Sequence, residues 1–134
     1  MAGTTLPPVR NSDGSISITC IINATTVASQ EYIAATIYHE VIHAYLNTVN
    51  PDLINNKSSH TEMYNNYMKS LESTLIKTFS NTDPSVLHVL ALDGIVNIGI
   101  DFGCTPEYLS MIKAKVEKQV SGRFGTPCTV QSNN

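Results

Sequence analysis

Residues 39–43 read HEVIH, and this short pattern constrains the fold more than any other part of the chain. It lies within residues 29–46, where apolar side chains such as Ile37 and Val41 recur at spacings of three and four. Such spacing is typical of a helix, because residues three and four apart share one face. The two histidines of the pattern must therefore project from the same side of a helix, about one turn apart.

Two imidazoles on one helix face can bind the same metal ion. Zinc suits this arrangement, since it accepts tetrahedral coordination by nitrogen and oxygen and lowers the pKa of a bound water to about 7. A carboxylate next to the site can take the proton of that water and pass it to a leaving amine. The pattern thus predicts His39 and His43 as zinc ligands and Glu40 as the general base of a hydrolase.

A catalytic zinc site normally takes a third ligand from the protein, and two candidates follow the motif. His60 would face the metal if a second helix packs antiparallel to the first, whereas Glu62 points away from that face. We expect His60 to be the ligand, with Glu62 as the alternative found in some aminopeptidases. His88 fits a helix-surface histidine better than a ligand.

Two tyrosines are candidates for the group that stabilises the oxyanion during hydrolysis. Tyr64 and Tyr67 follow His60 by one and two turns on the same predicted face. Both also fit the apolar stripe of that helix, where they would be core residues with a hydroxyl at the rim. A carboxylate normally orients a ligand imidazole, and Asp93 or Glu72 could do so here.

The remaining periodicities predict a mainly helical α+β fold of one domain over residues 1–134, with about four helices and a small N-terminal β element. The turn signal NSDG at 11–14 precedes alternating apolar residues. The predicted elements are a strand at 15–23 and helices at 29–46, 60–79, 84–94 and 106–120. We expect 1–14 and 129–134 to be flexible, 95–104 to be helix or strand, and 126–134 to add an edge strand or fray.

The chain resembles the small bacterial SprT-like zinc metallopeptidases. The likeness spans about residues 29–95 and rests on ATIYHEVIHAYL at 35–46, HTEM at 60–63 and LALDG at 90–94. It implies a minimal zincin-like fold with His39, His43 and His60 as zinc ligands and Glu40 as the general base. The basic DNA-binding extension of larger SprT relatives has no counterpart here.

Composition excludes several other classes of function. With 8 Lys and Arg against 11 Asp and Glu among 134 residues, the net charge of −3 argues against binding to nucleic acid. No apolar run approaches the roughly 18–20 residues of a membrane span, and 1–14 has no secretory signal. We therefore expect a soluble protein whose partner is a peptide or protein substrate, with no nucleic acid or membrane partner.

Two other interpretations stay open. Small SprT-like modules also resemble the toxin or effector ends of larger secreted proteins. In that case the domain would be delivered rather than cytoplasmic, and a cognate inhibitor or immunity protein would bind its cleft. Alternatively, the chain is a zinc-binding module without turnover, which a closed site with four protein ligands would support. The presence of Glu40 favours turnover.

Overall fold

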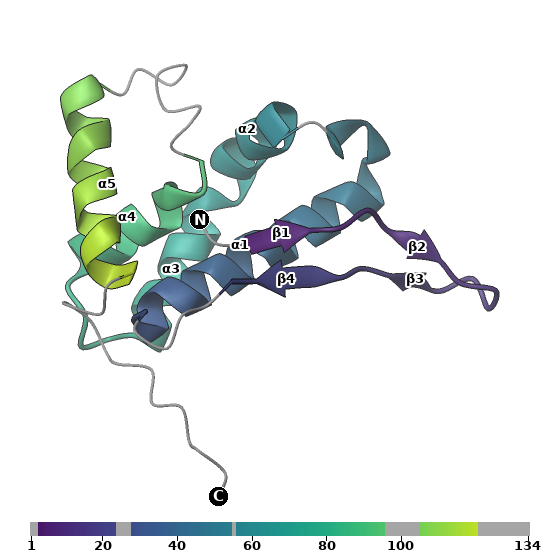
Figure 1. Ribbon diagram of the computed structural model, residues 1–134, viewed down its shortest axis with the longest axis horizontal. Helices are drawn as coiled ribbons and strands as arrows, with labels where there is room; N and C mark the ends of the chain where they lie inside the picture. The colour runs from purple at the N-terminus through teal and green to yellow at the C-terminus, as the bar shows by residue number, and fades with distance from the viewer. Residues whose placement is uncertain (1–2, 24–27, 55, 96–104, 121–134) are drawn as a thin grey trace, which may run out of the picture.

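The computed structural model describes residues 3–23, 28–54, 56–95 and 105–120. It confirms the mainly helical α+β class, with five α-helices in this part of the chain instead of about four (Figure 1). The elements are β1 Gly3–Thr5, β2 Val9–Arg10, β3 Ile16–Ser17, β4 Cys20–Ile22, α1 Gln30–Val49, the 3-10 helix η1 Pro51–Ile54, α2 Asn56–Asn66, α3 Met68–Thr78, α4 Pro84–Asp93 and α5 Pro106–Val120. Except for residue 95, the segments 95–104 and 126–134 of the prediction lie outside the described residues.

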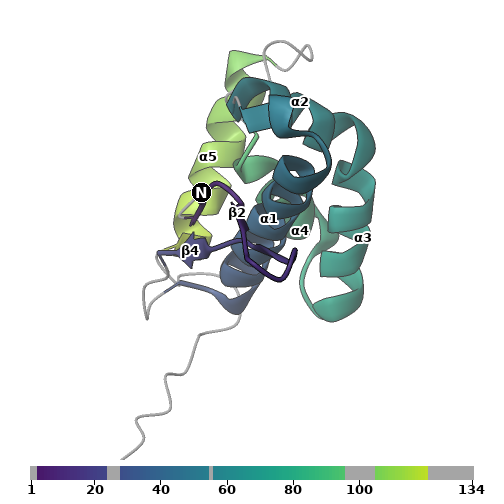
Figure 2. The same ribbon diagram turned by 90° about the vertical axis from the view of Figure 1, so that its right-hand side faces the viewer.

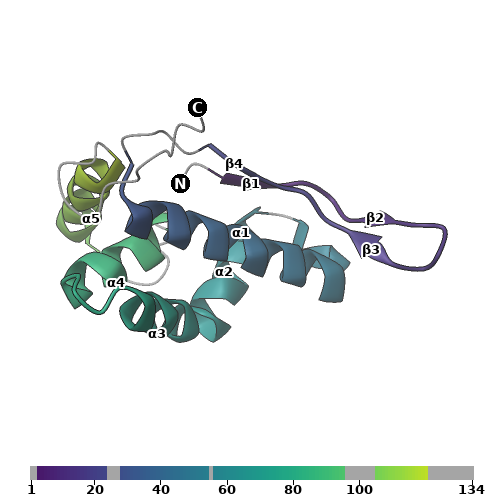
Figure 3. The ribbon, with the colours of Figure 1, turned by 90° about the horizontal axis from the view of Figure 1, so that it is seen from below.

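Helix α1 is the central element, and it contacts β1, β4 and each of the other helices in the described ranges. The paired strands β1 and β4 lie along one side, and α3 and α4 lie on the other (Figure 3). Figure 2 shows the same arrangement nearly end-on, with α1 between β4 and α3. The middle of α1 is therefore enclosed from two sides, and this is where the HEVIH residues lie.

The buried surface of α1 includes Ala35 and Leu46 but not two of the aliphatic residues whose spacing indicates the helix. Ile37 and Val41, whose spacing indicates the helix, are 41% and 53% exposed. His39, Glu40 and His43 are instead buried. The cause is the position of the strands and of α2, which cover the histidine-bearing face. The local prediction of a helix is confirmed, with Ser29 as its N-cap.

The predicted helix at 60–79 is two helices. The break is at Tyr67, whose φ of −121° departs from helical geometry. Helix α2 also begins earlier than predicted, at Asn56, so that His60 lies inside it rather than at its start. The break lets α2 reach the middle of α1 while α3 packs along α1 and α4, two directions that one straight helix cannot follow.

The N-terminal segment, expected to be a loop, contains two strands. In β1, Thr5 pairs with Cys20 of β4, and β2 pairs antiparallel with β3 across the predicted turn, where Gly14 has a φ of +85°. The predicted strand at 15–23 is correspondingly split into β3 and β4. Strands of two and three residues are too short to give a recognisable alternation of polar and apolar residues.

The apolar core lies between α1, α3, α4 and α5. Helix α5 has the predicted bounds, and Ile112 and Val116 of its apolar stripe are buried. Leu87 and Leu90 of α4 and Leu75 of α3 are fully buried in the same cluster. This core supports α1 from behind and leaves its opposite side to the strands. None of the helices in the described ranges has the length and apolar character needed to cross a membrane.

Candidate metal centre

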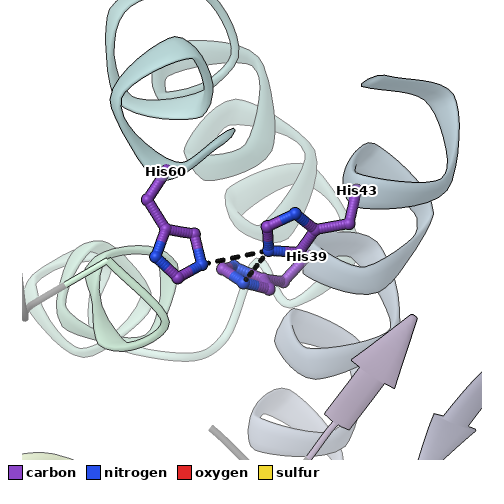
Figure 4. Close-up of side chains that lie close together, drawn as sticks. All are labelled: His39, His43 and His60. Carbon is purple, nitrogen blue, oxygen red and sulfur yellow. Dashed lines mark hydrogen bonds between the residues drawn. The ribbon is translucent and has the colours of Figure 1, made fainter. Parts of the chain in front are cut away.

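Three histidines from two helices meet beside the middle of α1 (Figure 4). Nε2 of His43 lies 3.0 Å from Nε2 of His39 and 3.0 Å from Nε2 of His60. The first two residues come from α1 and the third from α2. One ligand atom from each lies within 4.8 Å of the other two. The structure thus brings together the three predicted ligands, close enough to bind one metal ion.

Ser59 holds the central imidazole from behind. Its Oγ lies 2.7 Å from Nδ1 of His43, and both residues are buried. When this Nδ1 donates its proton to the hydroxyl, the lone pair of the ring falls on Nε2, the atom that faces the other two histidines. The contact with Ser59 thus accommodates the tautomer of His43 that can bind a metal.

Burial keeps the three imidazoles uncharged at neutral pH. Burial, and then the charge of the neighbouring His60, lowers the pKa of His43 to about 4. Burial likewise places the pKa of His39 far below 6.5, with His43 and His60 as further causes. The pKa of His60 is also lowered, mainly by burial. A neutral imidazole is the form that coordinates a metal, and burial keeps the three rings in this form at neutral pH.

Glu40 lies next to the histidines but outside the set of metal-binding atoms. Oγ1 of Thr5, at the end of β1, lies 2.6 Å from Glu40 Oε2. Burial raises the pKa of Glu40, and the hydrogen bond from Thr5 acts in the opposite direction. A carboxyl group beside a cluster of imidazoles can accept and donate a proton there.

Two glycines let the backbone approach these side chains closely. A Cβ atom at Gly3 would lie 2.5 Å from Oε1 of Glu40, and a Cβ atom at Gly94 would overlap the ring of His39. Gly94 directly follows α4, and Asp93 before it has a carboxyl group whose pKa is raised by burial. Any larger residue at either glycine would displace a functional side chain.

The site opens into a cavity of about 300 Å³. Its walls include the three histidines, Glu40, β1 and the segment Pro7–Pro8, with Asn47 and Leu53 at the α1–η1 side. Glu40 is the only residue with a formal charge at neutral pH among the described residues that line it. The groups that line the cavity are therefore mostly uncharged.

The alternative ligands lie elsewhere. Glu62 accepts a hydrogen bond from Asn66 of its own helix at 2.7 Å and is not part of the histidine group. Nδ1 of His88 lies 3.1 Å from a carboxylate oxygen of Glu72. The second of the two carboxylates proposed to orient a ligand therefore contacts a different histidine, on α4.

The structure does not bring the two candidate tyrosines to the cavity. Neither Tyr64 nor Tyr67 is among the residues that line it. The ring of Tyr67 instead packs edge-on against Tyr45, with 6.1 Å between ring centroids. Tyr64 belongs to α2, as His60 does, and Tyr67 lies at the break between α2 and α3.

Sequence reasoning did not identify Thr5, Ser59 or Gly94 as parts of the site. Ser59 precedes a predicted ligand directly, and that position beside His60 is a signal that could have suggested it. Gly94 indicates only the end of a helix when the sequence is read alone. Thr5 is 35 residues from Glu40 in sequence, and nothing local indicates that the two meet.

In comparisons with known proteins, no family model, curated protein or solved structure matches the chain. The similarity to SprT-like peptidases therefore stays an expectation that rests on the motif. The geometry itself establishes a cluster of three buried histidines able to hold a metal ion.

Proposed function

We propose that this protein is a zinc-dependent metallopeptidase. The observation that carries the proposal is the convergence of three neutral imidazoles beside the carboxyl group of Glu40, at the wall of an open cavity. Two nitrogens bound to tetrahedral zinc, each about 2.0–2.1 Å from it, are about 3.3 Å apart. The 3.0 Å separations of the Nε2 atoms are close to that value.

The residues of the chain divide the work. His39, His43 and His60 would hold zinc, which when bound lowers the pKa of water and polarises a peptide carbonyl. Glu40 takes a proton from the attacking water and delivers it to the amine that leaves. Ser59 keeps Nε2 of His43 available. A peptide or protein chain would occupy the cavity.

Three protein ligands favour turnover over a structural role. A structural zinc site is closed by four protein ligands, whereas a catalytic site keeps one position for water. Within the ranges that the structure covers, the group contains three residues and no fourth. This supports the peptidase over the non-catalytic zinc-binding module.

The Glu40→Gln variant tests the proposal. We expect the purified protein to bind about one zinc per chain and to cleave peptides of a quenched fluorescent library. Glu40→Gln should keep its zinc and its helical circular dichroism spectrum while its activity falls about 10²–10⁴-fold, the range lost with a general base.

The matched control is Glu117→Gln, which makes the same change at an exposed position of α5. It should cleave peptides at the rate of the wild-type protein. The proposal is wrong if the zinc-loaded wild-type protein cleaves no peptide of the library, or if Glu40→Gln cleaves as fast as the control.

A further inference from the structure

Thr5 makes the contacts that hold the Glu40 side chain. Its Oγ1 is 2.6 Å from Glu40 Oε2 and 3.0 Å from the main-chain oxygen of the same residue. Thr5 is the one hydrogen-bond partner of this carboxyl group within the described residues. The backbone of Gly3 packs against the opposite side of the group. Strand β1 thus holds a side chain of α1 at the wall of the cavity.

The hydroxyl of Thr5 has one proton and two oxygen acceptors within reach, and it also lies 3.7 Å from Sγ of Cys20. It can give that proton to Oε2 or to the carbonyl oxygen of Glu40, and its own lone pairs can accept a proton. An ionised carboxylate accepts from Thr5. A protonated carboxyl group donates to Thr5, and the hydroxyl then turns its proton to the carbonyl oxygen at 3.0 Å. Both forms of Glu40 therefore find a partner in the same position.

We propose that Thr5 is a positioning residue for Glu40 in peptide hydrolysis, and that its hydroxyl keeps the carboxyl group in place before and after proton transfer. This inference rests on the proposed peptidase function. If the Glu40 side chain rotated away after accepting a proton, it could not deliver that proton to the leaving group. A hydroxyl, which can donate or accept, can hold both forms of the carboxyl group, whereas a group that only donates can hold the ionised form alone.

Each proton in the proposed reaction has a donor and an acceptor. Water attacks the peptide carbonyl carbon, its O–H bond breaks, and the proton forms a new O–H bond on Glu40. The Thr5 hydroxyl turns from donor to acceptor toward Oε2. The carboxyl group then gives its proton to the peptide nitrogen as the C–N bond breaks, and Thr5 again donates to the regenerated carboxylate.

Two substitutions separate the hydroxyl from the shape of the side chain. Thr5→Val keeps the volume and removes the hydroxyl, whereas Thr5→Ser keeps the hydroxyl. Thr19→Val is the matched control, because Thr19 is an exposed threonine between β3 and β4 and does not line the cavity. Zinc content, kcat and KM are measured for each variant on the same peptide.

We expect Thr5→Val to lower kcat at least tenfold, with KM and zinc content within twofold of the wild-type protein. Thr5→Ser should recover most of the lost kcat, and Thr19→Val should behave as the wild type. The proposal is overturned if Thr5→Val retains kcat within twofold, or if Thr5→Ser is as slow as Thr5→Val.

A second measurement does not depend on peptide cleavage. Urea unfolding of Thr5→Val, Glu40→Ala and the double variant measures the coupling between the two residues. We expect Thr5→Val to lower the unfolding midpoint more in the wild-type background than in the Glu40→Ala background, where only the bond to the main-chain oxygen is left to lose. Equal effects in both backgrounds would show that Thr5 does not hold Glu40. If no peptide is cleaved, the peptidase proposal fails while this cycle still decides the role of Thr5.

Discussion

The protein contains two histidine sites whose ring nitrogens have different kinds of partner. In the metal centre, Nε2 of His43 has two other imidazole nitrogens at 3.0 Å and the residues are buried. On α4, the side chain of His88 is 41% exposed and lies between Glu72 at 3.1 Å and the hydroxyl of Tyr108 at 3.3 Å. The first histidine is surrounded by other histidines, and the second by complementary partners.

The partners of the ring nitrogens distinguish a histidine that can bind a metal from one that is already satisfied by the protein. A carboxylate and a phenol provide a partner for each ring nitrogen of His88, and the three residues link α3, α4 and α5. Three imidazole nitrogens that face one another cannot satisfy each other in the same way, because each neutral ring has one donor and one acceptor. A metal ion resolves that conflict by accepting all three lone pairs.

The largest expected effect is on zinc affinity when a ligand is removed. His60→Ala should weaken zinc binding more than about 100-fold, beyond what loss of an outer partner usually costs. His88→Ala and Glu62→Ala should leave the affinity unchanged, since neither residue joins the cluster. Competition with a chromogenic chelator measures all three. A strong effect of Glu62→Ala with none from His60→Ala would assign the third ligand to the carboxylate.

A smaller effect should follow from removing the partner behind each histidine. Ser59→Ala leaves Nδ1 of His43 without its hydroxyl, and we expect zinc affinity to fall about 10–100-fold. Tyr108→Phe removes the hydroxyl beside His88 and should cost about 0.5–1.5 kcal/mol of unfolding free energy or less, with zinc affinity unchanged. If both variants bind zinc as the wild-type protein does, Ser59 does not set the tautomer of His43.

The same contrast shows what could be predicted from the sequence. The helix at 29–46 and the ligand pair within it follow from local spacing, as does α5, since its cap and stripe are contiguous. The prediction of His60 assumes a packing of two helices, and the structure brings it to the pair. These features depend on residues within one helix or on neighbouring helices.

The features that sequence reasoning missed depend on long-range packing. Thr5 meets Glu40 only because β1 pairs with β4, and a strand of three residues leaves no pattern to read. The break at Tyr67 has no glycine or proline to indicate it and results from the different directions of α2 and α3. The break affects the expected position of Tyr67, which assumed one continuous helix, whereas Tyr64 shares α2 with His60.

The smallest expected effect is a pH dependence of the metal-free protein. The cluster histidines have folded-state pKa values below their ordinary 6.5, with His43 at about 4, so the unfolded chain binds more protons between these values. Their contribution to stability is complete above pH 6.5 and is lost as the pH falls from 6.5 toward 4. The melting temperature without zinc should therefore drop by several degrees between pH 7.5 and pH 5.

The size of the drop in melting temperature between pH 7.5 and pH 5 distinguishes the two histidine sites. His43→Gln removes a buried group that must gain a proton on unfolding, so the drop between pH 7.5 and pH 5 should become smaller than in the wild-type protein. His88→Gln leaves the buried cluster intact and should retain the wild-type drop. If the drop in melting temperature is the same in His43→Gln as in the wild-type protein, burial does not hold the histidine cluster neutral. Burial would then not explain why these imidazoles are in the form that binds a metal.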